Sequence, residues 1–172
     1  MHGEERLVAL EILRLAPERV GGLALVDTNA RPDTEAQAER RRAINAVVLA
    51  APDLRALGEA SLGGLVHEGA SEDVRRELVE MTVAVGARAY VRQNLAVMAR
   101  TDQRPILPKI RIPTKVVVGE ADVMTPLALS REIHAAIVGS TFHVVPKCGH
   151  LPPIETPQVM ADLLSQLLAI CA

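Results

Sequence analysis

Short apolar runs alternate along the chain with longer segments whose apolar residues recur at helical spacing. Three of these runs are bounded by glycine, proline or polar residues: Leu23–Val26, Lys115–Val118 and Thr141–Val145. Apolar runs of this length are typical of strands that are buried in a parallel sheet. We therefore predict three strands, one near the start of the chain and two in its last third.

Helical segments flank these strands. The apolar residues of Leu7–Leu15 follow a helical repeat, and Leu127–Ile137 begins directly after Pro126, which suits a first helical turn. A final helix is predicted from Pro157 to Ile170. The order of strands and helices, joined by short connections, predicts an α/β fold with a parallel sheet.

The stretch from about residue 32 to residue 104 is rich in Ala, Glu and Arg and shows no strand pattern. We predict a helix over Asp33–Leu49 and a stretch over Asp53–Val66 that its three glycines interrupt. Ser71 is a good N-cap for the next helix, and Gly86 separates that helix from another one. We expect one domain, residues 1–172, with a helical insertion at about 32–104.

Composition narrows the possible partners. The formal net charge is −2, which gives no electrostatic basis for binding nucleic acid. No apolar run reaches the roughly 18 residues that span a bilayer, and no signal-peptide pattern opens the sequence. The two cysteines, Cys148 and Cys171, are too few for a disulfide framework. We expect a cytoplasmic protein that binds neither nucleic acid nor membranes.

Two titratable residues follow predicted strands in matching positions. Asp122 comes just after Lys115–Val118, and His150 comes just after Thr141–Val145. Their separation of 150 − 122 = 28 residues corresponds to one helix and one strand, so both side chains can lie at the carboxyl edge of the sheet, where functional residues gather. A carboxylate beside an imidazole fixes its tautomer and stabilises the imidazolium. Ordinary polar surface roles are the alternative for each residue.

The segments around both residues resemble those of α/β-hydrolases. Residues 112–126 (IPTKVVVGEADVMTP) look like the acid-bearing segment of that family, and residues 144–155 (VVPKCGHLPPIE) look like its histidine segment. Residues 7–28 are similar to the helix and strand that follow the family's nucleophile, and the insertion resembles its helical cap. The resemblance implies a truncated α/β-hydrolase fold of about three parallel strands, with Asp122 as the catalytic acid and His150 as the base.

The family's nucleophile motif, G-x-S-x-G at a strand-to-helix turn, has no counterpart in the sequence. Alignment of the first helix places the serine position at Gly3, and His2 matches the residue before it. We expect the nucleophile turn and the strands before it to be absent. Two residues are candidates for the nucleophile: Ser61, in a glycine-containing loop, and Cys148, close to the histidine. Asp27 is a candidate for an alternative acid. Ser61 lies outside any G-x-S-x-G motif, a packing role is favoured for Cys148, and capping of the strand end is favoured for Asp27.

These observations predict a hydrolase of small carboxylic esters whose nucleophile is non-standard or supplied elsewhere. The alternatives are a catalytically degenerate protein that binds a ligand or partner, and one half of a split hydrolase. The scarcity of aromatic residues favours an aliphatic pocket for an apolar ester-like substrate. The sequence shows neither a metal-ligand cluster nor a phosphate-binding loop, so we expect no cofactor. Because an unpaired edge strand promotes association, we also expect a homodimer.

Overall fold

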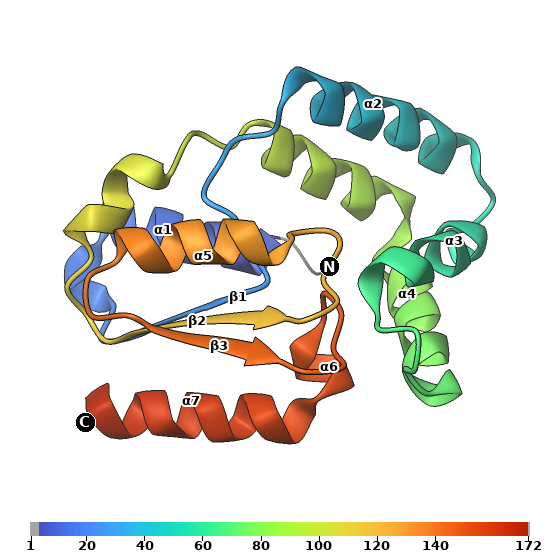
Figure 1. Cartoon of the computed structure of the whole chain (residues 1–172). Helices are drawn as coiled ribbons and strands as arrows, with labels where there is room; N and C mark the ends of the chain where they lie inside the picture. Colours follow the sequence, from blue (N-terminus) through green and yellow to red (C-terminus); the bar gives the residue numbers. More distant parts are fainter. Residues whose placement is uncertain (1–3, 172) are drawn as a thin grey trace.

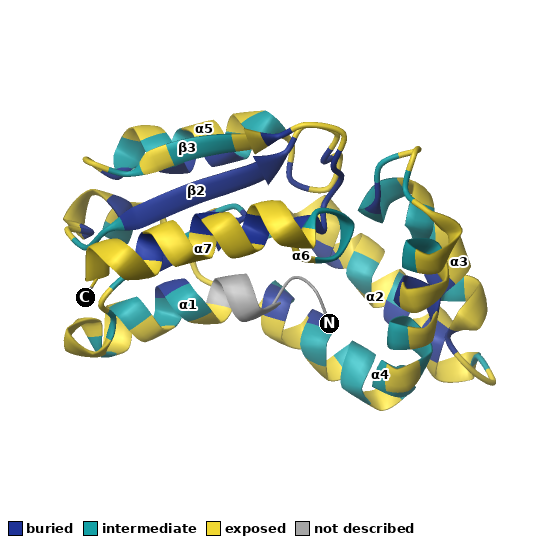
Figure 2. Ribbon diagram, turned by 90° about the horizontal axis from the view of Figure 1, so that it is seen from below, coloured by how far each residue is buried: buried dark blue, intermediate teal, exposed yellow. Residues whose placement is uncertain are grey.

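The centre of the computed structural model, which describes residues 4–171 and side chains from residue 8 onward, is a three-stranded parallel sheet. Its strands are β1 (Leu23–Val26), β2 (Thr114–Gly119) and β3 (Thr141–Val145), in that spatial order. β2 pairs with both neighbours and is buried along its whole length, whereas β3 is partly exposed (Figure 2). The three predicted strands and the parallel α/β class are confirmed.

Helices cover both faces of the sheet (Figure 1). α1 (Glu4–Leu15) and α5 (Leu127–Ala136) lie on one face, and α7 (Pro157–Cys171) lies on the other. Successive strand residues point to opposite faces, so Val116 packs toward α1 and α5 while Val117 packs toward α7. Both residues are at most 1% exposed. This sandwich of aliphatic side chains packs around the sheet in which the carboxyl ends of β2 and β3 lie side by side.

Three helices form an insert between β1 and β2, which we call the helical insert (residues 35–98). They are α2 (Glu35–Ala50), α3 (Arg55–Leu65) and α4 (Glu72–Met98). The insert lies beyond the carboxyl ends of the strands (Figure 1). Short helices connect the larger elements: η1 (Pro17–Arg19), η2 (Arg104–Lys109) and α6 (Pro152–Glu155). None of the described helices is long and apolar enough to cross a membrane.

The prediction that Gly58, Gly63 and Gly64 interrupt their segment was wrong, because α3 runs through all three residues. Tertiary packing explains the difference at Gly58. A Cβ atom at that position would lie 3.2 Å from the Cα atom of Val79 in α4. The glycine therefore lets two helices approach closely, and that contact offsets the roughly 1 kcal/mol that glycine costs within a helix.

The boundaries of α4 follow the predicted signals. The hydroxyl of Ser71 accepts a hydrogen bond from the backbone N–H of Val74 at 3.3 Å, which confirms Ser71 as the N-cap. Gly86 has φ +71° and ψ 157°, so it kinks the helix at the predicted break. α4 therefore consists of two arms, the first packed on α3 and the second on α2.

Candidate active site

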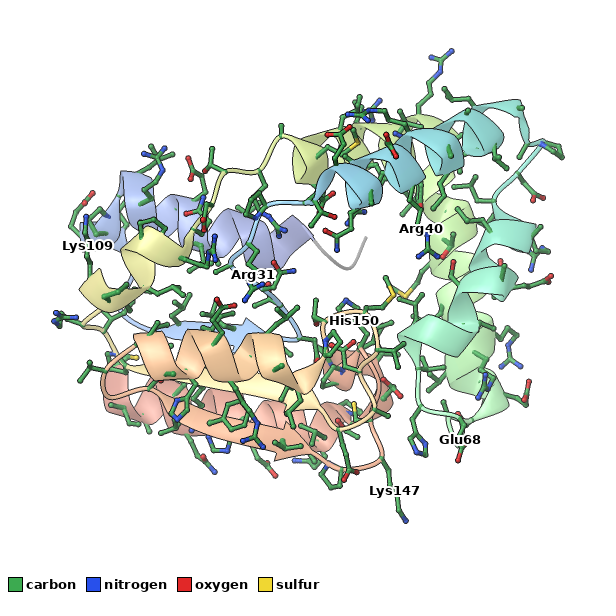
Figure 3. All side chains as sticks on the ribbon, turned by 45° about the horizontal axis from the view of Figure 1, so that its top comes forward. Arg31, Arg40, Glu68, Lys109, Lys147 and His150 are labelled. Carbon is green, nitrogen blue, oxygen red and sulfur yellow. The ribbon has the colours of Figure 1, made fainter. Side chains whose placement is uncertain are left out.

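His150 lies at the end of the sheet that faces the helical insert (Figure 3), and Asp122 contacts it there. Asp122 lies in the turn after β2, and His150 lies in the loop after β3. The Nδ1 atom of His150 is 3.0 Å from the Oδ2 atom of Asp122. His150 is only 7% exposed and Asp122 only 5%. The fold thus brings together the two residues whose spacing in the sequence predicts such contact.

Protein donors surround the carboxylate of Asp122. Oδ1 accepts hydrogen bonds from the backbone N–H groups of Met124 and Thr125 at 2.8 and 2.9 Å. Oδ2 accepts the hydroxyl of Thr125 at 2.5 Å in addition to the bond from His150. Burial alone would raise the pKa of Asp122, but the hydrogen bonds from His150 and Thr125 and the charge of the imidazole hold that pKa well below its usual range.

A charged Asp122 defines the tautomer of His150. The carboxylate is an acceptor only, so the Nδ1 atom of His150 must carry the proton between them. The Nε2 atom of the neutral imidazole then has a lone pair that can take a proton from a nucleophile. The buried carboxylate stabilises the positive charge that appears on the ring when it does so. The pair therefore has the geometry that a general base and its orienting carboxylate require.

Asp27 brings a second carboxylate to the same place. It follows β1 with φ +43° and is 1% exposed. Its Oδ1 atom accepts the backbone N–H of Gly119 at 2.7 Å, which joins the carboxyl ends of β1 and β2. This bond is the strand-end role that the sequence favours for Asp27. Its position also leaves it next to the imidazole–carboxylate pair.

Asp27, Asp122 and His150 each offer one ligand atom, and these atoms lie within 4.8 Å of one another. Two carboxylates and an imidazole are a donor set that suits several divalent metals. Both oxygens of Asp122 already accept hydrogen bonds from protein groups. That arrangement fits the orientation of an imidazole better than the coordination of a metal.

The loop that carries His150 packs closely against β2. A Cβ atom at Gly119 would lie 1.9 Å from the carbonyl oxygen of Gly149, so only glycine fits there. The backbone N–H of Ala121 also donates to the carbonyl of Cys148 at 2.9 Å. The turn bearing Asp122 and the loop bearing His150 therefore contact each other through their backbones.

Comparison with known proteins agrees with this arrangement. A model of the alpha/beta hydrolase family matches residues 7–163. The chain belongs to the α/β-hydrolase family.

Among its relatives in the α/β-hydrolase family is the pimeloyl-[acyl-carrier protein] methyl ester esterase of Aromatoleum aromaticum. It is 26% identical over 94% of this chain and 70% of its own length. A thermophilic esterase from Thermogutta terrifontis has a similar structure, with a TM-score of 0.89 and 26% identity. A hydrolase from Pseudomonas aeruginosa PA01 superposes with a TM-score of 0.80 and 28% identity. The chain spans 63% and 61% of those two structures, respectively.

The two candidate nucleophiles have other roles in this α/β-hydrolase. Ser61 lies inside α3 rather than in a loop, and its hydroxyl donates to the carbonyl of Leu57 at 2.7 Å. Burial, and secondarily the charge of Glu155, raise the pKa of the Cys148 thiol to about 12, so it stays protonated and unreactive near neutral pH. Gly3, the position aligned with the family's serine, lies outside the described residues.

Two residues that contact the pair or its loop were not predicted from the sequence. Thr125 supports Asp122 through both its hydroxyl and its backbone N–H. In turns, an Asp side chain commonly accepts hydrogen bonds from backbone N–H groups two and three residues later. The position of Thr125, three residues after Asp122, was therefore the signal in the sequence for this contact. Glu155 contacts the His150 loop from α6. It belongs to the histidine segment, but the sequence assigns it no partner.

Proposed function

We propose that this chain supplies the acid and base of a hydrolase of small carboxylic esters. The observation that carries the proposal is the buried 3.0 Å contact between His150 and Asp122. In the proposed reaction His150 removes a proton from the attacking hydroxyl, and the oxygen bonds to the ester carbonyl. The acyl C–O bond then breaks as His150 gives that proton to the leaving alkoxide, which releases the alcohol and leaves the acyl group on the attacking oxygen. If that oxygen comes from water the product is the carboxylic acid, and if it comes from a serine a water molecule releases the acid by a second round of the same proton transfers.

The surroundings of the pair favour an apolar substrate. Val123 and Met124 follow Asp122 directly and are 64% and 57% exposed. A Cβ atom at Gly64 of α3 would lie 3.4 Å from the sulfur of Met124, so these side chains face the helical insert. Exposed aliphatic side chains beside buried polar groups are typical of ligand sites. An aliphatic acyl or alcohol group fits this environment.

The nucleophile comes from outside the described residues or is water. Among those residues β1 pairs only with β2, which leaves one edge of the sheet open. α1, which packs on β1, exposes Val8, Ile12 and Leu15 along one face. An open strand edge flanked by apolar side chains suits a further strand. A segment that adds this strand, in the same chain or a different one, is the proposed source of the serine.

Hydrolysis of p-nitrophenyl acetate and butyrate tests the base directly. General-base catalysis of water attack accelerates a reaction by roughly 10²–10⁴-fold, so slow turnover by the purified chain is expected. His150→Gln should abolish this excess rate. His143→Gln is the matched control, because His143 lies on β3 and bonds Thr141 instead. Equal rates for the wild type and His150→Gln would exclude a catalytic role for His150 on these esters.

A split hydrolase predicts a hetero-complex. Co-purification from the source cell should recover a second chain that contains G-x-S-x-G, and hydrolysis should rise sharply only in the complex. A ligand that stabilises the chain equally before and after His150→Ala would instead indicate binding without catalysis. These results separate the split enzyme from the binding protein.

The open edge of β1 also supports a homodimer, in which two copies cover each other's edge. Light scattering at micromolar concentration should then give twice the chain mass of 18.5 kDa. A mass of one chain under these conditions would exclude the dimer. The two cysteines, which are both free thiols, support a cytoplasmic location because that compartment keeps thiols reduced.

A further inference from the structure

Glu155, the last residue of α6, lies against the loop that carries His150. Its Oε1 atom accepts the backbone N–H of Gly149 at 2.9 Å and that of Leu151 at 3.2 Å. These are the residues immediately before and after His150. One carboxylate oxygen therefore holds the backbone on both sides of the histidine.

The second oxygen of Glu155 reaches the helical insert. Oε2 accepts the backbone N–H of His67, just after α3, at 2.7 Å. In the same region the backbone N–H of His150 donates to the carbonyl of Leu65 at 2.9 Å. A Cβ atom at Gly149 would lie 2.7 Å from the carbonyl carbon of Val66, so the two backbones are in direct contact. Glu155 thus bridges the histidine loop and the insert.

The bridge requires a carboxylate. The backbone groups that bond to Glu155 are all N–H donors. None of the ion pairs among the described residues includes Glu155. Its charge is instead stabilised by backbone N–H groups and by the thiol of Cys148 at 3.6 Å. A glutamine has one acceptor oxygen, so its NH2 group would face an N–H donor on one side of the bridge.

We propose that Glu155 is the positioning residue of this site. It fixes the backbone at His150 so that Nδ1 points at Asp122, and it fixes the insert against the same loop. This inference rests on the proposed function, in which His150 acts as the base. The placement of His150 can nevertheless be measured without turnover.

Nuclear magnetic resonance of the full chain with labelled histidine tests the proposal. The wild type should show a low-field Nδ1 proton of His150, bonded to Asp122. In Glu155→Gln this signal should broaden or disappear, because the loop loses one side of its anchor. Glu120→Gln is the matched control. Its carboxylate also accepts a backbone N–H of this loop, that of Lys147 at 3.2 Å, but it does not flank the histidine.

Amide hydrogen exchange provides the second measurement. In the wild type the amides of Gly149, Leu151 and His67 should be protected from exchange, because all three donate to the carboxylate of Glu155. Glu155→Gln should accelerate the exchange of at least one of them by about tenfold or more. Ile133→Val, a purely apolar change in the core, controls for a general loss of stability.

The proposal is overturned if Glu155→Gln retains the His150 signal and the protection of all three amides. It is also overturned if Ile133→Val causes the same local losses, since these would then follow from stability alone. Both readouts are independent of ester hydrolysis. A protein that shows them but hydrolyses no ester, either alone or together with a nucleophile-bearing chain, would refute the proposed function and leave the positioning role in place.

Discussion

Gly119 lies so close to the His150 loop that a methyl group does not fit. A Cβ atom at residue 119 would lie 1.9 Å from the carbonyl oxygen of Gly149, whereas real Cβ contacts are essentially never shorter than 3.0 Å. The oxygen would have to move by at least 3.0 − 1.9 = 1.1 Å. The bond from His150 to the carbonyl of Leu65, 2.9 Å long, would not survive that shift. We therefore expect Gly119→Ala to cost about 3 kcal/mol, at the upper end of overpacking effects.

Differential scanning calorimetry measures this cost. In a domain of this size about 3 kcal/mol lowers Tm by roughly 6–12 °C. Gly63→Ala is the control, because Gly63 is exposed within α3 and nothing lies within 4 Å of the added Cβ atom. Alanine is the better helix former, so this variant should gain about 0.5–1 kcal/mol. If Gly119→Ala melted within about 2 °C of the wild type, the close-packing argument would be refuted.

Three further expectations concern single side chains. Asp122→Asn offers His150 an NH2 group in place of an acceptor, so the imidazole should change to the Nε2–H tautomer; unchanged ring nitrogen shifts in magnetic resonance would contradict the assigned hydrogen bond. The folded-state pKa of Asp122 lies below its ordinary value of 3.8, so its contribution to stability is present above that pH and is lost as the pH falls through the folded-state pKa. Urea unfolding between about pH 6 and pH 2 should therefore show a smaller acid-induced loss in Asp122→Asn than in the wild type, and equal losses would count against this assignment. Ser71→Ala should destabilise the chain by about 1 kcal/mol through the lost N-cap, which the same urea titration would detect at neutral pH, and an unchanged midpoint would argue against the cap.

The sheet could be predicted because its strands are strongly patterned. Val116, Val117 and Val118 form a short β-branched run that is typical of a strand buried on both faces, and β2 is such a strand. The pairing of Asp122 with His150 followed from topology, since parallel neighbouring strands bring their carboxyl ends together. Local pattern and chain order are sufficient for such features.

The remaining features depend on contacts between distant segments. Gly58 reads as a helix breaker by its own propensity, but its contact with Val79 outweighs that preference. Glu155 accepts a hydrogen bond from the backbone of His67, which lies 88 residues away in the sequence. No short motif can predict a contact over that separation. Likewise, the place of Asp27 beside the pair depends on the pairing of β1 with β2. Tertiary geometry, rather than composition or periodicity, determines these details.

The open edge of β1 has a further consequence for how the protein behaves as its concentration changes. Two copies related by a two-fold axis would meet at this edge with antiparallel strands, whereas the sheet itself is built from parallel ones. A strand edge accepts one neighbour at a time. Self-association and completion of the sheet by a nucleophile-bearing segment are therefore competing equilibria. Dilution should favour the completed hydrolase over the homodimer if that segment belongs to the same chain, whereas dilution weakens both assemblies if it belongs to a second chain.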